Sequence, residues 1–327
     1  MTMKRALITG ITGQDGVYLT EHLLGKNYAV TGICSDLLSP KLASFRNRFP
    51  EVQIFQIDLT SIPALFEIFV STYPDEIYNL AAKSSAGESW QNSIENSKIN
   101  GFAVSCILEA LRLYILESKN STKFLQASSS EIFGKAETAK QNETSNMRPQ
   151  TPYGVAKLYA HNMVQTYRSG YEMFAVNAIL FNHESPLRDN RFVTRKITSG
   201  VARIASGDLR PISLGDLETR RDWGHSFDYV RALNLMLQIT APMDFVIGTG
   251  ETHSIREILD IAFAAIGISD WSPYVIYDPS LERPTRVDPL VADTKSAQLI
   301  LKWEPMIDFQ TIIEEMVESD MRKYAEM

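Results

Sequence analysis

The stretch that decides the fold is Ala6-Leu7-Ile8-Thr9-Gly10-Ile11-Thr12-Gly13-Gln14-Asp15-Gly16, close to the start of this 327-residue chain. Its apolar run is typical of a buried strand, its glycines recur every three residues, and the residues after it have the apolar spacing of a helix. Glycines in that context allow a tight turn and let a pyrophosphate approach the backbone at the helix N-terminus. The sequence therefore predicts a dinucleotide-binding turn, with an ordinary strand-to-helix turn as the alternative.

Strands and helices alternate along the first half of the chain. Short apolar runs predict further strands at residues 28–33, 52–57, 77–81, 124–128 and 174–180, and a long apolar helix at 99–116. Such alternation predicts a parallel sheet with helices on both faces. After Asn182 the pattern becomes irregular, with more proline and charge. We therefore expect an α/β fold: a Rossmann-type doubly wound parallel sheet with a smaller C-terminal α/β substrate-binding domain, divided into residues 1–181 plus roughly 222–249 and residues 182–221 plus 250–327.

The composition argues against several classes of protein. A chain with 44% apolar and 22% charged residues is ordinary for a globular protein, and its length suffices for a sizeable core. A net charge of −7 argues against nucleic-acid binding, which usually requires a basic patch. Cys34 and Cys106 lack zinc or disulfide spacing, so we expect no metal site and a cytoplasmic location. No apolar run approaches the roughly 20 residues of a membrane span, so we expect no membrane contact.

Two polar side chains are spaced for joint chemistry. Tyr153 and Lys157 lie four residues apart at the start of a predicted helix, which places them on one helix face. A nearby ammonium group lowers the pKa of a phenol, and a phenolate is a suitable base for a sugar hydroxyl that is about to lose hydride. The same spacing also occurs by chance on solvated helix faces.

The strand end Ala127-Ser128-Ser129-Ser130-Glu131 supports the catalytic interpretation. Doubly wound folds keep their active sites at the carboxyl ends of parallel strands, and a hydroxyl there can hold a substrate oxygen beside Tyr153. If the strand stays regular, its alternation brings Ser129 and Glu131 to one face. A serine-rich helix cap is the alternative.

Acidic residues at two other strand ends are candidates for contacts to the adenosine part of a cofactor. Asp36 follows the second strand, where a carboxylate often binds the ribose 2′-hydroxyl, and no arginine adjoins it to meet a 2′-phosphate. Arg46 and Arg48 lie further along the chain. Asp58 ends the third strand, near the expected adenine edge, with a polar strand terminus as the alternative.

The glycine turn, the Ser-Ser-Glu strand end and the Tyr-x-x-x-Lys pair together resemble the extended short-chain dehydrogenase/reductase family. Longer segments are similar to the GDP-mannose 4,6-dehydratases within that family. They lie at residues 180–186, 192–197, 221–225 and 249–254 and have the sequences LFNHESP, FVTRKI, RDWGH and TGETHS. The resemblance therefore covers both expected domains.

The resemblance implies a role for each matching residue. Four would be catalytic: Ser129, which replaces a threonine of the family, Glu131 as the acid/base, and Tyr153 with Lys157, which would also touch the nicotinamide ribose. The rest of the cofactor site would consist of Gly10, Thr12, Gly13, Gln14, Asp15, Gly16, Asp58, Leu59, Ala81, Ala82, Ser84, His183 and Arg188. The nucleotide sugar would face Asn182, Lys196, Arg221 and Arg283.

The chain departs from the family pattern at two places. Ser35 and Asp36 replace two arginines that in the family contact a 2′-phosphate and help to form a tetramer. The cofactor is therefore expected to be either NAD or NADP, and the assembly either a homodimer or a homotetramer. Lys83-Ser84-Ser85-Ala86 replaces Gln-Ser-His-Val, and Glu88 replaces a small apolar residue. Ser85 and Glu88 would lie near the sugar, so a sugar other than mannose is conceivable.

The resemblance implies a nucleotide-sugar 4,6-dehydratase that converts GDP-mannose, or a relative such as a GDP-heptose, into the 4-keto-6-deoxy product. Tyr153 would remove the O4 proton while hydride leaves C4 for a tightly bound NADP or NAD, and the hydride would return to C6. Glu131 would remove the C5 proton and protonate the departing water. The alternatives are a 4-keto-6-deoxy-sugar reductase or a 4-epimerase, neither of which needs Glu131, and a non-catalytic cofactor-binding protein.

Overall fold

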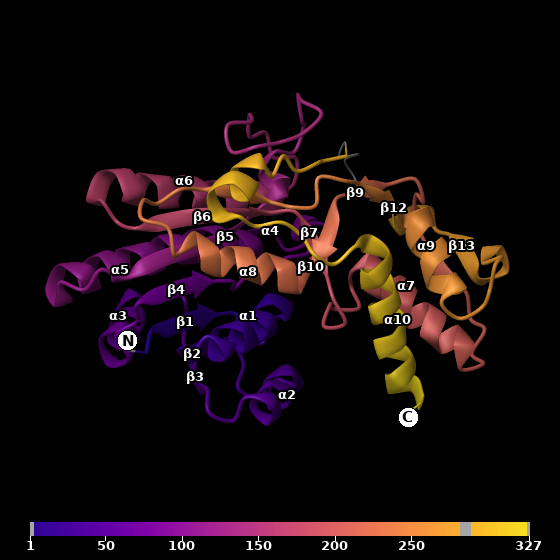
Figure 1. Cartoon of the computed structure of the whole chain (residues 1–327), viewed down its shortest axis with the longest axis horizontal. Helices are drawn as coiled ribbons and strands as arrows, with labels where there is room; N and C mark the ends of the chain where they lie inside the picture. Colours follow the sequence, from indigo (N-terminus) through magenta and orange to yellow (C-terminus); the bar gives the residue numbers. More distant parts are fainter. Residues whose placement is uncertain (1–2, 282–288, 326–327) are drawn as a thin grey trace.

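A seven-stranded parallel sheet forms the centre of the molecule. A computed structural model describes residues 3–281 and 289–325 and gives the strand order β11-β6-β5-β4-β1-β2-β3 (Figure 1). Every neighbouring pair runs parallel, which confirms the expected Rossmann-type sheet. The strands are β1 (Arg5–Thr9), β2 (Ala29–Cys34), β3 (Gln53–Gln56), β4 (Glu76–Asn79), β5 (Lys123–Ser129), β6 (Ala175–Leu180) and β11 (Phe245–Ile247). The apolar runs predicted the first six, whereas β11 is only three residues long and carries too little pattern to be found in sequence.

Helices cover both faces of this sheet. One buried cluster joins the sheet to α1, α2 and α8, and a second joins it to α3, α5 and α6. Each helix presents one apolar stripe to the sheet, and α2, α3 and α6 have a proline among their first two residues, whose fixed φ suits the first helical turn. The bounds are α1 (Gln14–Gly25), α2 (Pro40–Arg48), α3 (Ile62–Thr72), α5 (Ala103–Ser118), α6 (Pro152–Tyr171) and α8 (Ser226–Met236).

One of these helices is unusually apolar. The helical stretch Ser93–Ser118, which ends in α5, is long and apolar enough to span a membrane by length and composition, although the sequence analysis found no run of that length. In the structure 56% of its most apolar window is buried, because α5 packs between α3 and α6. Its buried apolar residues thus belong to the core between the sheet and the helices α3 and α6.

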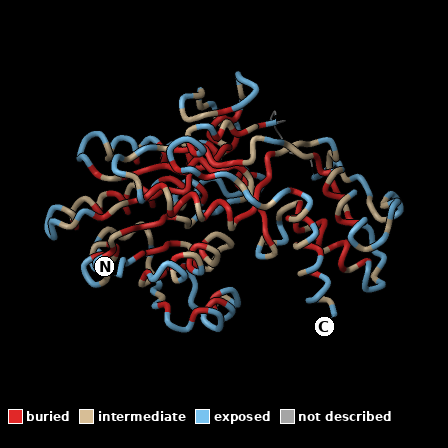
Figure 2. The backbone as a smooth tube through the Cα atoms, viewed as in Figure 1, coloured by how far each residue is buried: buried red, intermediate tan, exposed pale blue. Residues whose placement is uncertain are grey.

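The C-terminal part of the chain has a core of its own, separate from the two clusters at the sheet (Figure 2). It contains α7 (Val193–Ala205), α9 (Ile255–Ala264) and α10 (Phe309–Ala325), which lie beyond the carboxyl ends of the main strands in Figure 1. Three two-stranded sheets accompany them: β7 (Asn182–Glu184) with β10 (Trp223–His225), β9 (Arg220–Arg221) with β12 (His253–Ser254), and β8 (Ile212–Leu214) with β13 (Val275–Tyr277). The shorter helical segments are η1 (Glu88–Trp90), α4 (Ser93–Ser97), η2 (Lys98–Phe102), η3 (Ser130–Ile132), η4 (Ser272–Tyr274), η5 (Pro279–Leu281) and η6 (Ala297–Leu301).

The strand order also fixes where a ligand can bind. The chain proceeds outward from β1 to β3 and then returns to place β4 on the other side of β1. At such a reversal the connections leave in opposite directions, so a crevice opens at the carboxyl ends of β1 and β4. Gly10 and Ala81 follow these two strands and lie against each other at the floor of that crevice.

A glycine at the start of α1 is expected to be indispensable for packing. A Cβ at Gly16 would clash with Ile11 O and lie 2.5 Å from the carbonyl carbon of the same residue. Gly16→Ala should therefore lower the free energy of unfolding by about 1–3 kcal/mol, as overpacking usually does, and urea denaturation measures that change. Gly25→Ala, at the other end of the same helix, is the matched control, because a Cβ there has no described atom within 4 Å. Equal midpoints for Gly16→Ala and the unmodified chain would contradict the packing argument.

Candidate active site

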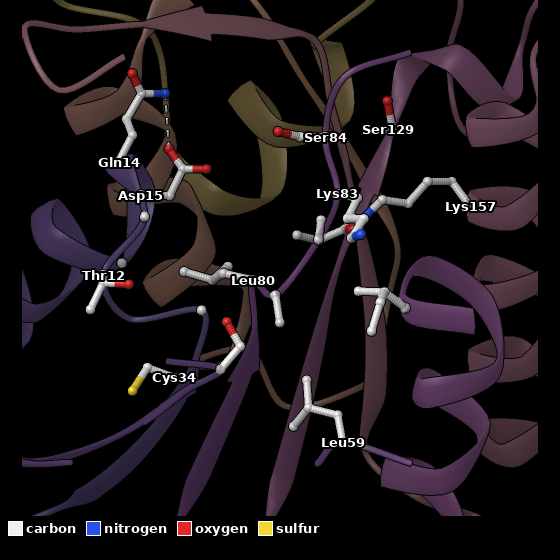
Figure 3. Close-up of a pocket in the computed structure, with 18 of the residues that line it drawn as sticks. Thr12, Gln14, Asp15, Cys34, Leu59, Leu80, Lys83, Ser84, Ser129 and Lys157 are labelled. Carbon is white, nitrogen blue, oxygen red and sulfur yellow. Dashed lines mark hydrogen bonds between the residues drawn. The ribbon is translucent and has the colours of Figure 1, made fainter. Parts of the chain in front are cut away.

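A cavity of about 880 Å³ opens at the carboxyl ends of the main strands. Figure 3 shows Thr12 and Gln14 of the glycine turn on one side of it and Ser129 and Lys157 on the other. The structure brings all of the residues proposed for cofactor binding and catalysis to this cavity, together with Asn182, which was expected to face the nucleotide sugar. They are Gly10, Thr12, Gly13, Gln14, Asp15, Gly16, Asp36, Asp58, Leu59, Ala81, Ala82, Ser84, Ser129, Glu131, Tyr153, Lys157, Asn182, His183 and Arg188.

The glycine turn has the backbone that close approach requires. Gly10 has φ +67°, and a Cβ there would lie 2.8 Å from Ala81 Cα, so no other residue fits without strain. Gly13 N donates to Gly10 O at 2.9 Å and closes the turn. Within the described chain, no side chain caps the N-terminus of α1, so the first N–H groups of this helix remain available to an anion.

The end of β5 does not continue as a regular strand. β5 stops at Ser129, and Ser130–Ile132 forms a 3₁₀ turn, so strand alternation does not describe the relation of Ser129 to Glu131. The Ser129 hydroxyl accepts a hydrogen bond from Glu131 N at 3.3 Å, as in the alternative of a helix cap. Both side chains nevertheless line the cavity. Capping and exposure to a ligand are thus compatible here.

The first turn of α6 packs tightly against this strand end. Thr151 caps the helix by accepting from Gly154 N at 3.0 Å, and its hydroxyl donates to Glu131 Oε2 at 3.4 Å. A Cβ at Gly154 would lie 2.6 Å from Glu131 O, so glycine is what allows the helix to come this close. Tyr153 and Lys157 share the helix face that meets the cavity, as their spacing predicts.

The electrostatics of this pair differ from the prediction. Burial raises the pKa of Tyr153 to about 12, although a hydrogen bond with Ser129 opposes the rise. Burial also lowers the pKa of Lys157 to about 8. Lys157 Nζ lies 5.8 Å from the centre of the Tyr153 ring and donates to Ala127 O at 2.8 Å. The expected lowering of the phenol pKa by Lys157 is therefore wrong in this arrangement, because the ammonium is directed at a backbone carbonyl while the phenol is fully buried.

An ion pair joins the glycine turn to the segment after β6. His183 Nε2 lies 2.9 Å from Asp15 Oδ2, and Ser226 Oγ donates to Asp15 Oδ1 at 2.6 Å. Burial alone would raise the pKa of Asp15, but the charge and hydrogen bond of His183, with help from Ser226, lower it to about 2. The same pairing raises the pKa of His183 despite its burial. A negative charge in an anion-binding turn is thereby compensated within the protein.

The wall of the cavity beside β2 and β3 is acidic. Asp36 is exposed and lines the cavity directly after β2. Asp58 lines it after β3 and also accepts from the backbone and hydroxyl of Thr60 at 2.9 and 2.8 Å, as a polar strand terminus does. Arg46 and Arg48 are not among the described lining residues, and Arg48 pairs with Glu21 on the surface.

A comparison with protein families decides what kind of chain this is. The family model described as GDP-mannose 4,6 dehydratase matches residues 7–316. The chain belongs to the GDP-mannose 4,6-dehydratase family. The resemblance seen in the sequence motifs is thereby confirmed, and it extends across both the main sheet and the C-terminal part.

Individual members of the GDP-mannose 4,6-dehydratase family are similar over almost their full length. The GDP-mannose 4,6 dehydratase of Cricetulus griseus is 42% identical, over 97% of this chain and 91% of its own. That of Vibrio cholerae is 39% identical, over 99% of this chain and 95% of its own. Among solved structures, the UDP-glucose 4-epimerase of Thermus thermophilus in complex with NAD superposes with a TM-score of 0.83 at 24% identity, over 97% of this chain and 98% of that one. This last likeness shows the shared fold.

Some residues that the GDP-mannose 4,6-dehydratase resemblance assigns to the substrate lie elsewhere. Among the described residues, Ser85 and Glu88 do not line the cavity. Ser85 Oγ instead accepts a hydrogen bond from Glu88 N at 3.3 Å, and the Glu88 carboxylate pairs with Arg191. Lys196 lines a second hollow of about 320 Å³. Arg221 lies on β9, whose partner is β12. Arg283 lies outside the described residues.

The structure also adds residues to the site that sequence reasoning missed. Ser226, at the start of α8, holds Asp15, and Lys41 at the start of α2 lines the cavity and pairs with Asp189. No local pattern links partners so far apart in sequence. Among the residues that the structure describes, no group of histidine, cysteine and acidic side chains could hold a metal ion, and Cys34 and Cys106 are both buried free thiols.

Burial of the Lys157 ammonium should lower the free energy of unfolding of this GDP-mannose 4,6-dehydratase family member. A pKa that is lowered by one corresponds to a loss of about 1.4 kcal/mol in the free energy of unfolding. A fall of the Lys157 pKa from 10.5 to about 8 therefore corresponds to a loss of about 3 kcal/mol at pH 7. Lys157→Met removes this cost but leaves Ala127 O without its donor, so we expect a net gain of about 1–3 kcal/mol at pH 7. Between pH 8 and 10.5 the unfolded chain binds the extra proton, so the unmodified protein becomes relatively more stable and the gain should shrink.

Urea denaturation at pH 7, 8, 9 and 10 measures this difference. Lys26→Met is the matched control, because it makes the same substitution at an exposed lysine at the end of α1 and removes no buried ammonium. A Lys157→Met variant that is less stable than the unmodified chain at every pH would show that the ammonium is not penalised by burial.

Proposed function

We propose that this chain is a 4,6-dehydratase of a GDP-linked hexose, either GDP-mannose or a close relative such as a GDP-heptose. The observation that carries the proposal is that Ser129, Glu131, Tyr153 and Lys157 line one cavity together with the glycine turn. In a chain of the GDP-mannose 4,6-dehydratase family, this set supplies a hydroxyl, a carboxylate and a phenol with a nearby ammonium. The product would be a 4-keto-6-deoxy sugar nucleotide.

The residues present fit a nicotinamide dinucleotide. The bare backbone at Gly10 and the uncapped N-terminus of α1, as far as the chain is described, suit a pyrophosphate. The cavity of about 880 Å³ has Asp36 and Tyr153 in its lining, and the Thermus thermophilus epimerase of the same fold was solved with NAD. When bound, a nicotinamide would take up a hydride from the sugar and return it in the same turnover.

Tyr153 and Ser129 would hold the O4 hydroxyl of the sugar. Ser129 is close enough to oppose the rise of the Tyr153 pKa, and both side chains line the cavity, so they can contact one oxygen together. With a pKa of about 12, Tyr153 keeps its proton at neutral pH and begins as a hydrogen-bond donor. To accept the O4 proton, Tyr153 must first lose its own proton to solvent. In this arrangement Lys157 Nζ lies 5.8 Å from the ring centre and donates to Ala127 O, so it does not offset the raised pKa that opposes this loss.

Glu131 would carry out the elimination. Once C4 is a ketone, the C5 proton is acidic, and the carboxylate of Glu131 would remove it. The resulting carboxylic acid would give a proton to O6, so that water leaves and a C5–C6 double bond forms. The double bond would then be saturated by return of the hydride to C6 and by a proton from solvent at C5. The contact of Glu131 with Thr151 at the capped start of α6 holds the carboxylate in place for both proton transfers.

The rival activities would use fewer of these groups. A reductase of a 4-keto-6-deoxy sugar nucleotide, or a 4-epimerase, would need Ser129, Tyr153 and Lys157 but no acid/base at Glu131. A non-catalytic cofactor-binding protein would need only the glycine turn. Since Glu131 lines the same cavity as the other three, we favour the dehydratase.

Further properties belong to this proposal. Asp36 favours NAD, or relaxed specificity, because a carboxylate repels a 2′-phosphate. Residues 1–181 plus roughly 222–249 would bind the cofactor, and residues 182–221 plus 250–327 would bind the GDP-sugar, with Lys196 and Arg221 toward its nucleotide end. We expect a homodimer or homotetramer in the cytoplasm, without a nucleic-acid or membrane partner.

Replacing Glu131 should separate the dehydratase from its rivals. Glu131→Gln keeps the shape but removes the base, so oxidation at C4 should proceed while elimination slows by about 10²–10⁴-fold. Reduced nicotinamide should therefore accumulate after GDP-mannose is added in a single turnover, and its absorbance measures the effect. Tyr153→Phe should give no reduced nicotinamide, because the first proton transfer is lost.

Glu137→Gln is the matched control, since Glu137 is an exposed glutamate nearby in sequence that pairs with Arg148. It should turn over GDP-mannose like the unmodified chain, with water lost and no added NADH or NADPH consumed. Stoichiometric consumption of added reduced cofactor by the unmodified chain would instead indicate a reductase, and elimination at an unchanged rate in Glu131→Gln would leave that residue only a structural role.

A further inference from the structure

An ion pair links two segments of the cavity wall that are far apart in sequence. Lys41 Nζ lies 2.9 Å from Asp189 Oδ2, and the two residues are 148 positions apart. Lys41 lines the cavity at the start of α2, on the same wall as Asp36. Asp189 lies in the loop between Arg188 and Phe192, both of which also line the cavity. The pair therefore joins the two rims of the site.

Asp189 is held in place by its own loop. Its Oδ1 accepts from Arg191 N at 3.2 Å and from Arg191 Nε at 3.0 Å, while its Oδ2 faces Lys41. Arg191 in turn pairs with Glu88 at 2.8 Å. Partial burial would raise the pKa of Asp189, but the hydrogen bonds from Lys41 and Arg191 lower it far below its usual range. The carboxylate is thus permanently charged and fixed in orientation at neutral pH.

The position of Lys41 gives this pair a consequence for ligand binding. NAD and NADP differ only in the 2′-phosphate of the adenosine ribose, which in a doubly wound fold lies beside the end of the second strand. From Ile33 to Lys41 the chain contains one anionic residue, Asp36, and one cationic residue, Lys41. A phosphate group at this wall would be attracted by a free lysine ammonium and repelled by a carboxylate.

We propose that Asp189 is a specificity-determining residue: by pairing with Lys41, it keeps that ammonium from a 2′-phosphate and makes the site discriminate against NADP. The proposal rests on the dinucleotide binding proposed above and adds a residue from the substrate-side loop to it. Asp36 accounts for repulsion on the β2 side, whereas the Lys41–Asp189 pair removes the attraction that would otherwise offset it. Cofactor choice is then set jointly by both rims of the cavity.

A double-mutant cycle on binding, independent of turnover, tests this proposal. Dissociation constants for NAD and NADP are measured by titration calorimetry on the full chain, freed of bound nucleotide, for Asp189→Asn, Lys41→Met and the double variant. Asparagine retains an Oδ1 acceptor for Arg191, so the loop should keep its conformation. Asp189→Asn should tighten NADP binding by about threefold to fivefold, the upper part of the range expected of one partly exposed charge pair, and change NAD binding by less than twofold. In the Lys41→Met background the same substitution should give no such gain.

Two outcomes would overturn the proposal. If Asp189→Asn leaves the ratio of the two constants unchanged, the pair has no part in specificity. If the gain persists without Lys41, the carboxylate acts only by general repulsion and does not sequester the lysine. Glu318→Gln, which removes one negative charge from a surface pair on α10, is the matched control and should not change the ratio. Failure of the unmodified chain to bind either dinucleotide would instead refute the proposed function.

Discussion

The close packing of α6 against the end of β5 is the contact on which the rest of the site depends. Gly154 lets the helix backbone approach Glu131 O, and Lys157 Nζ reaches across to Ala127 O at 2.8 Å. These contacts lie on either side of Ser129 in the chain, so the Ser129 hydroxyl keeps a fixed position relative to the side chains of Tyr153 and Lys157. Any larger residue at Gly154 would push the helix away and separate the side chains that line this part of the cavity.

Burial at this edge of the sheet sets the protonation of the groups that face the cavity. Tyr153 titrates at about 12 and Lys157 at about 8, both because water is excluded from them, while the His183 partner keeps Asp15 at about 2. A buried ammonium held against a backbone carbonyl, with only the charge of Asp15 to oppose the effect of burial on its pKa, lowers the stability of the fold. This destabilisation is confined to the cavity wall, and the buried apolar clusters on both faces of the sheet and in the C-terminal part stabilise the fold.

The loop that follows β6 connects the two parts of the molecule through charge. His183 pairs with Asp15 of the glycine turn, and Asp189 pairs with Lys41 on the opposite side of the same cavity. Between them Arg188 pairs with the buried Glu184 and stacks on Phe192. One segment thus contacts the dinucleotide-binding elements at two points before it enters α7 of the C-terminal part. A ligand in the cavity and a ligand near α7 would therefore both contact this segment.

The sequence by itself determined the features whose signal is local. The strand, glycine turn and helix around Gly10 follow from apolar spacing and the need for a positive φ, and the shared face of Tyr153 and Lys157 follows from helical geometry. The glycine turn, the residues at the end of β5 and the Tyr153–Lys157 pair were therefore predictable as parts of the cavity lining, whereas Ala81, His183 and Arg188 were placed there only by the family resemblance. Tertiary structure alone decided that Asp15 meets His183 across 168 positions, that Glu88 turns to Arg191, and that the Tyr153 pKa rises instead of falling. Contacts between distant segments and the exclusion of water depend on how the whole chain packs, and no local pattern encodes either.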